Sequence, residues 1–183
     1  SETIKQRCKE KYGLSKAQII LSSTHTHTGP VLRNALYDIY ELTDSRINLI
    51  EQYSTKVEKQ IVDLVGESLE NMGPAILSSN NGVVRFQVNR RNNRLTTLSA
   101  RTNLNGPNDY AVPVLQAEKP DGSLAAVLFG YACHPTVLSS YQWSGDYPGF
   151  AQFDLEKELP GTTAMFFQGC GADQNPLPRR SVG

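Results

Sequence analysis

The chain has 183 residues, and its 18 basic and 18 acidic side chains give no formal net charge. This length suits one domain with a hydrophobic core. The balanced charge excludes the basic excess that a nucleic-acid groove or an anionic membrane surface requires, and no apolar run is long enough for a transmembrane helix.

The N-terminal segment predicts a helix over residues 1–12 followed by a strand over residues 18–23. The helix is indicated by apolar residues at a spacing of four and by Gly13, a common helix stop. The strand is indicated by the apolar run of residues 17–21, and Gly29-Pro30 ends it.

Two of the three histidines, His25 and His27, lie in Thr-His-Thr-His-Thr-Gly-Pro directly after this apolar run. If the strand continues, side chains two residues apart point to the same face, so both imidazoles project together. Such a pair beside a turn suits a metal or catalytic site. Two polar strand-end histidines bonded to backbone remain the alternative for an isolated pair.

The middle of the chain predicts a long helix that begins at Thr43 and ends at Gly73-Pro74. A short strand over residues 75–79, a turn at residues 80–82 and a half-buried strand over residues 84–88 follow. The next polar cluster contains three arginines and predicts either a solvated loop or a clamp for an anion or carboxylate.

The third histidine, His134, follows a hairpin of two predicted strands, residues 112–118 and 124–133, joined by a Lys-Pro-Asp-Gly turn. Every histidine therefore lies where a predicted strand gives way to a turn. Because such positions gather at one edge of a sheet in α/β proteins, we expect the three histidines to meet.

The last third of the chain predicts a helix after the loop of residues 144–149, with Asp146 as its N-terminal cap or as a site carboxylate. A strand over residues 163–168 then enters a glycine-rich loop, residues 169–176. Such a loop collects backbone N–H groups and suits an oxyanion or a phosphate. The lysine pattern of a nucleotide P-loop is absent, which argues against nucleotide binding.

These elements predict a mixed α/β fold in a single domain over residues 1–183. Candidate strands outnumber the connecting helices, and one hairpin is antiparallel. We therefore expect a mixed β-sheet core with helices packed on its outside.

Five motifs, in this order along the chain, resemble the N-terminal catalytic domain of the neutral/alkaline (non-lysosomal) ceramidases. They are His25-Thr26-His27-Thr28-Gly29-Pro30, Asn89-Arg90, Cys133-His134-Pro135-Thr136, Gly145-Asp146-Tyr147-Pro148-Gly149 and Gly171-Ala172-Asp173-Gln174-Asn175-Pro176. The resemblance spans nearly the whole chain and identifies it as a divergent member.

The resemblance implies a zinc-dependent amidase that cleaves ceramide into sphingosine and a fatty acid. It implies that His25 and His134 bind Zn²⁺ and that His27 lies beside the metal, where it holds substrate or moves protons. It also implies that Arg90 lines the site. The loop that carries Asp173 and Asn175 would position substrate.

Two departures from the family pattern affect these expectations. Asn175 occupies the position of the family's serine, which is assigned as nucleophile or substrate-positioning group, although an asparagine amide could still support an oxyanion. The family completes its zinc site with a glutamate and a tyrosine further downstream. We therefore expect this chain to be part of a larger catalytic domain and to be inactive by itself.

Three functional hypotheses follow from the sequence. The first is a zinc amidohydrolase that acts on a ceramide-like lipid, and the second is an inactive ceramidase-like domain that binds lipid or a partner. The third is a zinc hydrolase of a non-lipid ester or amide.

The resemblance favours a secreted, periplasmic or cell-surface location with peripheral membrane contact, although the first residues show no signal-peptide pattern. The oligomeric state is left open.

Overall fold

The computed structural model describes residues 1–93 and 104–177. Backbone contacts divide the chain into two compact units. The first comprises Ser1–Leu21 and Pro30–Gly73, and the second comprises Ser22–Gly29 and the chain from Pro74 onward. The single domain expected from the sequence stays a prediction.

The first unit is helical, with α1 (Glu2–Tyr12), the short 3-10 helix η1 (Lys16–Gln18) and α2 (Asp44–Glu70). Both long helices confirm the sequence prediction, although α2 ends at Glu70, before the expected stop at Gly73-Pro74. Gly13 ends α1 with a left-handed φ of 73°, and the Thr43 hydroxyl caps α2 by accepting from the backbone N–H of Arg46 at 3.4 Å.

The small core of this unit lies between α1 and α2. Its buried members are Ile4, Cys8, Ile19 and Val62. Tyr12 lies over Gly66 of α2, where a Cβ atom would stand only 2.3 Å from the tyrosine hydroxyl. The glycine in this long helix therefore lets the tyrosine ring approach the helix backbone.

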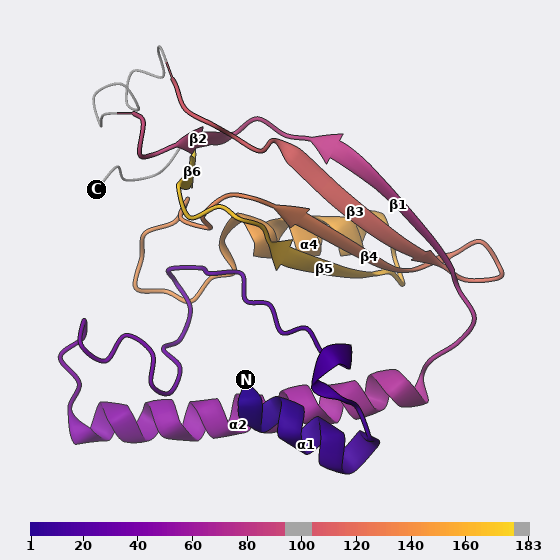
Figure 1. Ribbon diagram of the computed structural model, residues 1–183, viewed down its shortest axis with the longest axis horizontal. Coiled ribbons are helices and arrows are strands. Elements are labelled where there is room, and N and C mark those ends of the chain that lie inside the picture. The colour runs from indigo at the N-terminus through magenta and orange to yellow at the C-terminus, as the bar shows by residue number, and fades with distance from the viewer. Residues whose placement is uncertain (94–103, 178–183) are drawn as a thin grey trace. The chain divides into compact units, whose positions relative to one another are not determined.

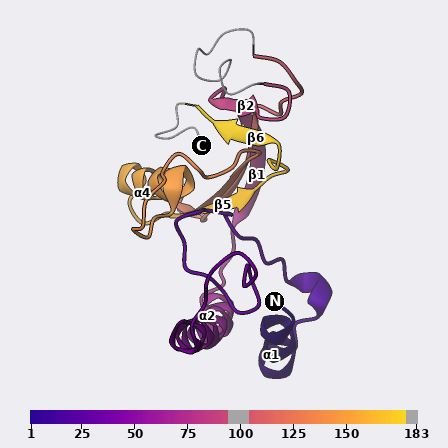
Figure 2. The ribbon, with the colours of Figure 1, turned by 90° about the vertical axis from the view of Figure 1, so that its left-hand side faces the viewer.

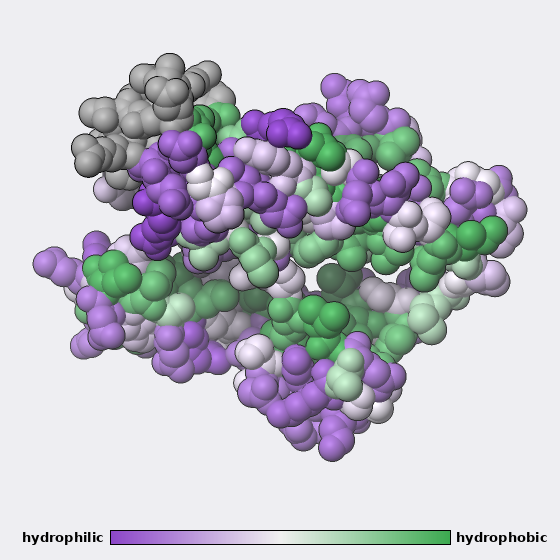
Figure 3. Space-filling model, turned by 45° about the horizontal axis from the view of Figure 1, so that its top comes forward, coloured by the Kyte–Doolittle hydropathy of each residue, from purple (hydrophilic) through white to green (hydrophobic). Residues whose placement is uncertain are grey.

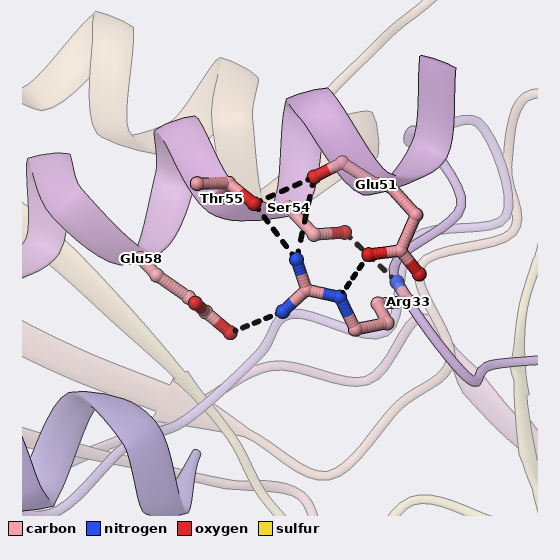
Figure 4. Close-up of polar contacts among 5 residues, drawn as sticks. All are labelled: Arg33, Glu51, Ser54, Thr55 and Glu58. Carbon is pink, nitrogen blue, oxygen red and sulfur yellow. Dashed lines mark hydrogen bonds and ion pairs between the residues drawn. The ribbon is translucent and has the colours of Figure 1, made fainter. Parts of the chain in front are cut away.

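The irregular segment after Pro30 is tied to α2 by Arg33 (Figure 4). Its guanidinium pairs with Glu51 and, at 3.2 Å, with Glu58, and it also donates to the Thr55 hydroxyl at 2.8 Å. Its backbone N–H donates to Ser54 Oγ at 2.8 Å. These charge-assisted contacts fix the segment on α2.

The strand predicted over residues 18–23 is wrong. This segment is η1 followed by irregular chain, and Ile20 is 92% exposed. Only Ile19 of the apolar run enters the core. An apolar run forms a strand only when a neighbouring strand satisfies its backbone, and none pairs with this segment in the described residues.

The second unit is built on a mixed four-stranded sheet in the order β1-β3-β4-β5, as Figure 1 shows. Its strands are β1 (Ile76–Val83), β3 (Ala111–Glu118), β4 (Leu124–Tyr131) and β5 (Thr163–Gln168). β1, β3 and β4 pair antiparallel, whereas β4 and β5 are parallel. Helix α4 (Asp146–Glu158) connects these last two and packs against β5 (Figure 2). The predicted fold class and hairpin are confirmed.

Two predicted boundaries in this unit differ from the structure. The turn expected at residues 80–82 is wrong, because these residues continue β1 and pair with Val112–Val114 of β3. The partner strand overrides the local turn signal. The strand expected over residues 84–88 is reduced to β2 (Gln87–Asn89), which pairs with β6 (Gln174–Pro176). Arg94 and most of the polar connection after it lie outside the described residues.

Hydrophobic residues reach the surface at many places among the hydrophilic ones, as Figure 3 shows for one face. All eight residues of β1 are exposed, including Ile76, Leu77 and Val83. β1 is also an edge strand without a charged residue, so it lacks the usual protection against further strand pairing.

In the part of the chain that the structure describes, no helix has the length and apolar character to cross a bilayer.

Candidate metal centre

The three histidines meet in the second unit. The ring centroids of His25 and His134 are 5.0 Å apart, those of His25 and His27 are 5.3 Å apart, and those of His27 and His134 are 5.9 Å apart. One ring nitrogen of each lies within 4.8 Å of those of the others. Three imidazole nitrogens at such separations can bind one metal ion, so the predicted meeting of the histidines is confirmed.

His134 is the buried member of this group, at 7% exposure. It leaves the end of β4, and its Nδ1 lies 2.7 Å from the carbonyl oxygen of Gly171 and 3.2 Å from that of Gln174. Because a carbonyl only accepts, Nδ1 carries the proton and Nε2 holds the free lone pair. This hydrogen bond therefore selects the tautomer that offers Nε2 as a ligand.

Burial lowers the pKa of His134 below its ordinary value of 6.5, and the positive charge of Arg90 adds to the effect. The unfolded chain then binds a proton that the folded chain resists, so stability is expected to fall as pH drops through about 6.5. Urea unfolding of the metal-free chain between about pH 7.5 and pH 5.5 measures this slope. His134→Gln should flatten the dependence of stability on pH. An unchanged slope in that variant would show that His134 is not the group that causes it.

The segment that carries His25 and His27 is irregular, so the strand predicted to align them is wrong. His25 has a left-handed φ of 58°, a conformation in which histidine is enriched among non-glycine residues. Thr26 and Thr28 donate from their hydroxyls to the carbonyl oxygen of Ser144 at 3.2 and 3.0 Å. These bonds hold the threonines inward and leave both histidines exposed.

Arg90, Asp173 and Asn175 come together through the pairing of β2 with β6. The backbone N–H of Arg90 donates to the carbonyl of Asp173 at 2.7 Å, and the Asp173 carboxylate accepts from Nδ2 of Asn89 at 2.9 Å. The backbone N–H of His134 donates to the Gln174 carbonyl at 3.1 Å. Residues 173 and 174 therefore accept hydrogen bonds from two segments at once, from the backbone of Arg90 and from the backbone of His134.

Asn175 is buried at 6% exposure, and its Oδ1 meets no hydrogen-bond donor among the described residues. A buried amide oxygen without a donor costs free energy, so a bound molecule that offers an N–H or O–H group would find a ready acceptor. By contrast, Asp173 is engaged in bracing β2, which is a structural use of its carboxylate.

Asp146 does not cap α4 in the way that the sequence suggests. The N-cap is Gly145, without a side-chain cap bond, and Asp146 is the first residue of the helix, with a buried carboxylate. Sequence reasoning assigned no role to Asn89, Ser144 and Gln174. Asn89 braces the Asp173 carboxylate through its side-chain amide, whereas Ser144 and Gln174 accept hydrogen bonds at their backbone carbonyls. Asn89 and Gln174 lie within the quoted motifs, which is the only signal that could have pointed to them.

Gly171 has a clear steric reason to be glycine. A Cβ atom there would stand 2.4 Å from the backbone nitrogen of Cys133. Because His134 follows Cys133, this close approach also places the Gly171 carbonyl within hydrogen-bond distance of Nδ1 of His134. The glycine-rich loop therefore orients the buried imidazole.

Two surface hollows are lined by other residues than those of this centre. One is lined by Arg7 of α1 and by polar residues of α2, including Glu51 and Lys56. The other lies on the large sheet and includes Asn80 and Phe167. Neither contains a histidine, so the chemistry of the side chains marks the candidate site better than surface shape does.

No protein-family model matches the chain. Among solved structures it is similar to a ceramidase complexed with C2, with a TM-score of 0.74 and 22% sequence identity over 96% of this chain. The fold is that of the neutral ceramidases. The neutral ceramidase from Pseudomonas aeruginosa gives a TM-score of 0.73 and 22% identity over 99% of this chain. The chain spans 28% and 30% of the lengths of these two ceramidases.

Proposed function

We propose that the chain belongs to a divergent branch of the neutral ceramidases and forms part of a zinc-dependent hydrolase that cleaves the N-acyl amide bond of a ceramide-like lipid. The observation that carries this proposal is the group of three histidines, located in a chain with the ceramidase fold. All three histidines belong to the motifs on which the sequence resemblance rests.

The side chains of the centre suit zinc. Zn²⁺ prefers imidazole nitrogen ligands, and a catalytic site usually has three protein ligands. His25 and His134 would hold the ion, the latter through Nε2, because its Nδ1 is engaged by carbonyls. His27 would lie beside the ion.

When bound, zinc supplies Lewis acidity and lowers the pKa of a bound water to about 7. His27 then moves a proton between water and the leaving amine, because an imidazole titrates in the required range. Arg90 and Asn175 would position the substrate through hydrogen bonds. This scheme needs no nucleophilic serine, which fits Asn175 at the position of that serine.

The proposal is tested by measuring zinc per chain, by elemental analysis, in the full-length protein that contains this chain, after gel filtration. Near-stoichiometric zinc supports the centre, and turnover of a substrate panel that begins with ceramides then supports the reaction. A full-length protein that holds no zinc and gains none when metal is added would remove the zinc hydrolase proposal. Retained zinc without turnover of any ceramide would remove the ceramide-like substrate.

A ceramidase-like domain that binds lipid without turnover is the second candidate, and Asn175 in place of a serine favours it. The fluorescence of Trp143 offers a direct test, because it is the chain's one tryptophan and is 78% exposed. An emission shift on addition of a short-chain ceramide, in protein that does not cleave it, would support this candidate.

Two substitutions at Asn175 separate the candidates. If its amide supports the reaction, Asn175→Ala should lower kcat by about 10²–10³-fold, the usual cost of losing an oxyanion donor. Asn175→Ser should retain more activity than the alanine variant. Equal turnover in all three proteins would show that the side chain takes no part.

A further inference from the structure

We propose that Asp146 is a positioning residue of the histidine centre, which it assembles by holding both histidine-bearing segments in one hydrogen-bond network. The inference rests on the proposed metal centre and not on the identity of the substrate. Asp146 is fully buried, at 0% exposure, although a buried carboxylate is costly unless it is well paired.

The Asp146 carboxylate accepts three backbone N–H groups. Oδ2 accepts from Leu138 at 2.8 Å, and Oδ1 accepts from Val137 at 3.2 Å and from Tyr147 at 2.7 Å. An ionised carboxylate only accepts, with about four lone-pair sites, so it suits three donors that approach together. Two of these donors belong to the loop that follows His134, and the carboxylate therefore fixes the course of that loop.

The residue after Asp146 secures the other side of the same histidine. The Tyr147 hydroxyl donates to the carbonyl of Cys133 at 2.7 Å, and Nε2 of Gln168 donates to that carbonyl at 3.0 Å. Burial raises the pKa of Tyr147 far above its ordinary value, so its hydroxyl keeps the proton that it donates. Asp146 and Tyr147 together hold the backbone before and after His134.

The network continues to the paired histidines through Ser144. The backbone N–H of Asp146 donates to Ser144 Oγ at 3.0 Å. The Ser144 carbonyl accepts the hydroxyls of Thr26 and Thr28, and its N–H donates to the Thr28 carbonyl at 3.1 Å. Since these threonines flank His27, a shift at Asp146 would move the paired histidines relative to His134.

The backbone at Asp146 also indicates a specialised position. Its φ of 52° lies in the left-handed region, which few residues other than glycine adopt, and His25 of the same centre shares this feature. Asparagine and aspartate both tolerate this conformation because their short polar side chains bond locally. Asp146→Asn therefore tests the carboxylate while keeping the shape and the backbone.

In Asp146→Asn, one oxygen becomes an NH₂ group that faces backbone N–H donors. We expect zinc affinity to fall by about 10–100-fold, the usual loss when a group that orients metal ligands is removed. The visible absorption of bound Co²⁺ should also change. The matched control is Val127→Ala, a core substitution in β4 at a residue of 5% exposure, which should weaken the fold without changing either signal.

A second readout needs no metal. The chain has only three histidines, so their ring proton signals in NMR spectra are readily assigned. The contact between the rings of His25 and His134, whose centroids lie 5.0 Å apart, should give a cross-peak that Val127→Ala keeps and Asp146→Asn loses. If the full-length wild-type protein binds no metal, the proposed function fails, and this ring contact still decides the role of Asp146.

An Asp146→Asn variant that keeps both the ring contact and the metal affinity would overturn the inference. Should that variant fail to fold, Thr28→Val breaks the same network at its other end by removing the hydroxyl that donates to Ser144. It should lose the ring contact while the Leu138 amide stays protected from hydrogen exchange. Retention of the contact in Thr28→Val would likewise overturn the inference.

Discussion

Replacing His25 with alanine in the full-length protein is expected to abolish stoichiometric zinc binding and turnover together. His25 would supply one of the two principal ligands, and its ring lies 5.0 Å from that of His134. The loss of zinc affinity should exceed the about 10–100-fold typical of groups that only orient a ligand. Elemental analysis and a hydrolysis assay on the same preparation measure the two effects.

His27→Gln is the matched comparison for this experiment. If His27 moves protons and does not hold the metal, this variant should keep its zinc and lose about 10²–10⁴-fold in turnover, the usual contribution of a general acid–base group. Loss of zinc in both variants would make His27 a third ligand. Retained turnover in His25→Ala would contradict the assignment of this centre as the catalytic zinc site.

Gly171→Ala is expected to have the second large effect. The new Cβ would stand 2.4 Å from the backbone nitrogen of Cys133, and backbone cannot swing aside as the end of a side chain can. Forced atoms in a packed site typically cost about 1–3 kcal/mol of stability. The displaced loop should also withdraw the Gly171 carbonyl from Nδ1 of His134 and weaken zinc binding.

Gly149→Ala provides the control for this steric argument. Gly149 lies in α4, and in the described part of the chain no heavy atom beyond its chain neighbours and its own helix backbone stands within 4 Å of the Cβ that alanine would add. Because alanine favours a helix over glycine by up to about 1 kcal/mol, this variant should be as stable as the wild type or more stable. Urea unfolding of both variants measures the difference. Equal stabilities would show that the loop near Cys133 yields to the added methyl group.

The sequence was sufficient where the signal was local. Thr43 predicted the start of α2 because a hydroxyl side chain caps a helix through its own neighbours. The turn that ends at Gly122 was also predicted correctly, because its residue preferences are local. Gly122 has a φ of 83°, and its N–H donates to the Lys119 carbonyl at 2.9 Å. Apolar patterns likewise located β3, β4 and β5.

The sequence failed where a distant partner decided the outcome. Residues 80–82 have the composition of a turn, yet β3 pairs with them and extends β1. The apolar run before the paired histidines has the composition of a strand, yet no strand pairs with it in the described residues. Strand formation depends on the neighbour that satisfies the backbone, and a local pattern carries no information on that neighbour.

For the candidate site, the sequence by itself determined which residues carry the chemistry: three histidines, each at a break in an apolar segment and each within a ceramidase-like motif. Only the tertiary structure decided how they meet. The threonine bonds to Ser144 and the approach of Gly171 to Cys133 join segments distant in the chain, and His25 adopts a left-handed backbone conformation. The physical reason is that hydrogen bonds and close contacts between distant segments depend on the folded backbone.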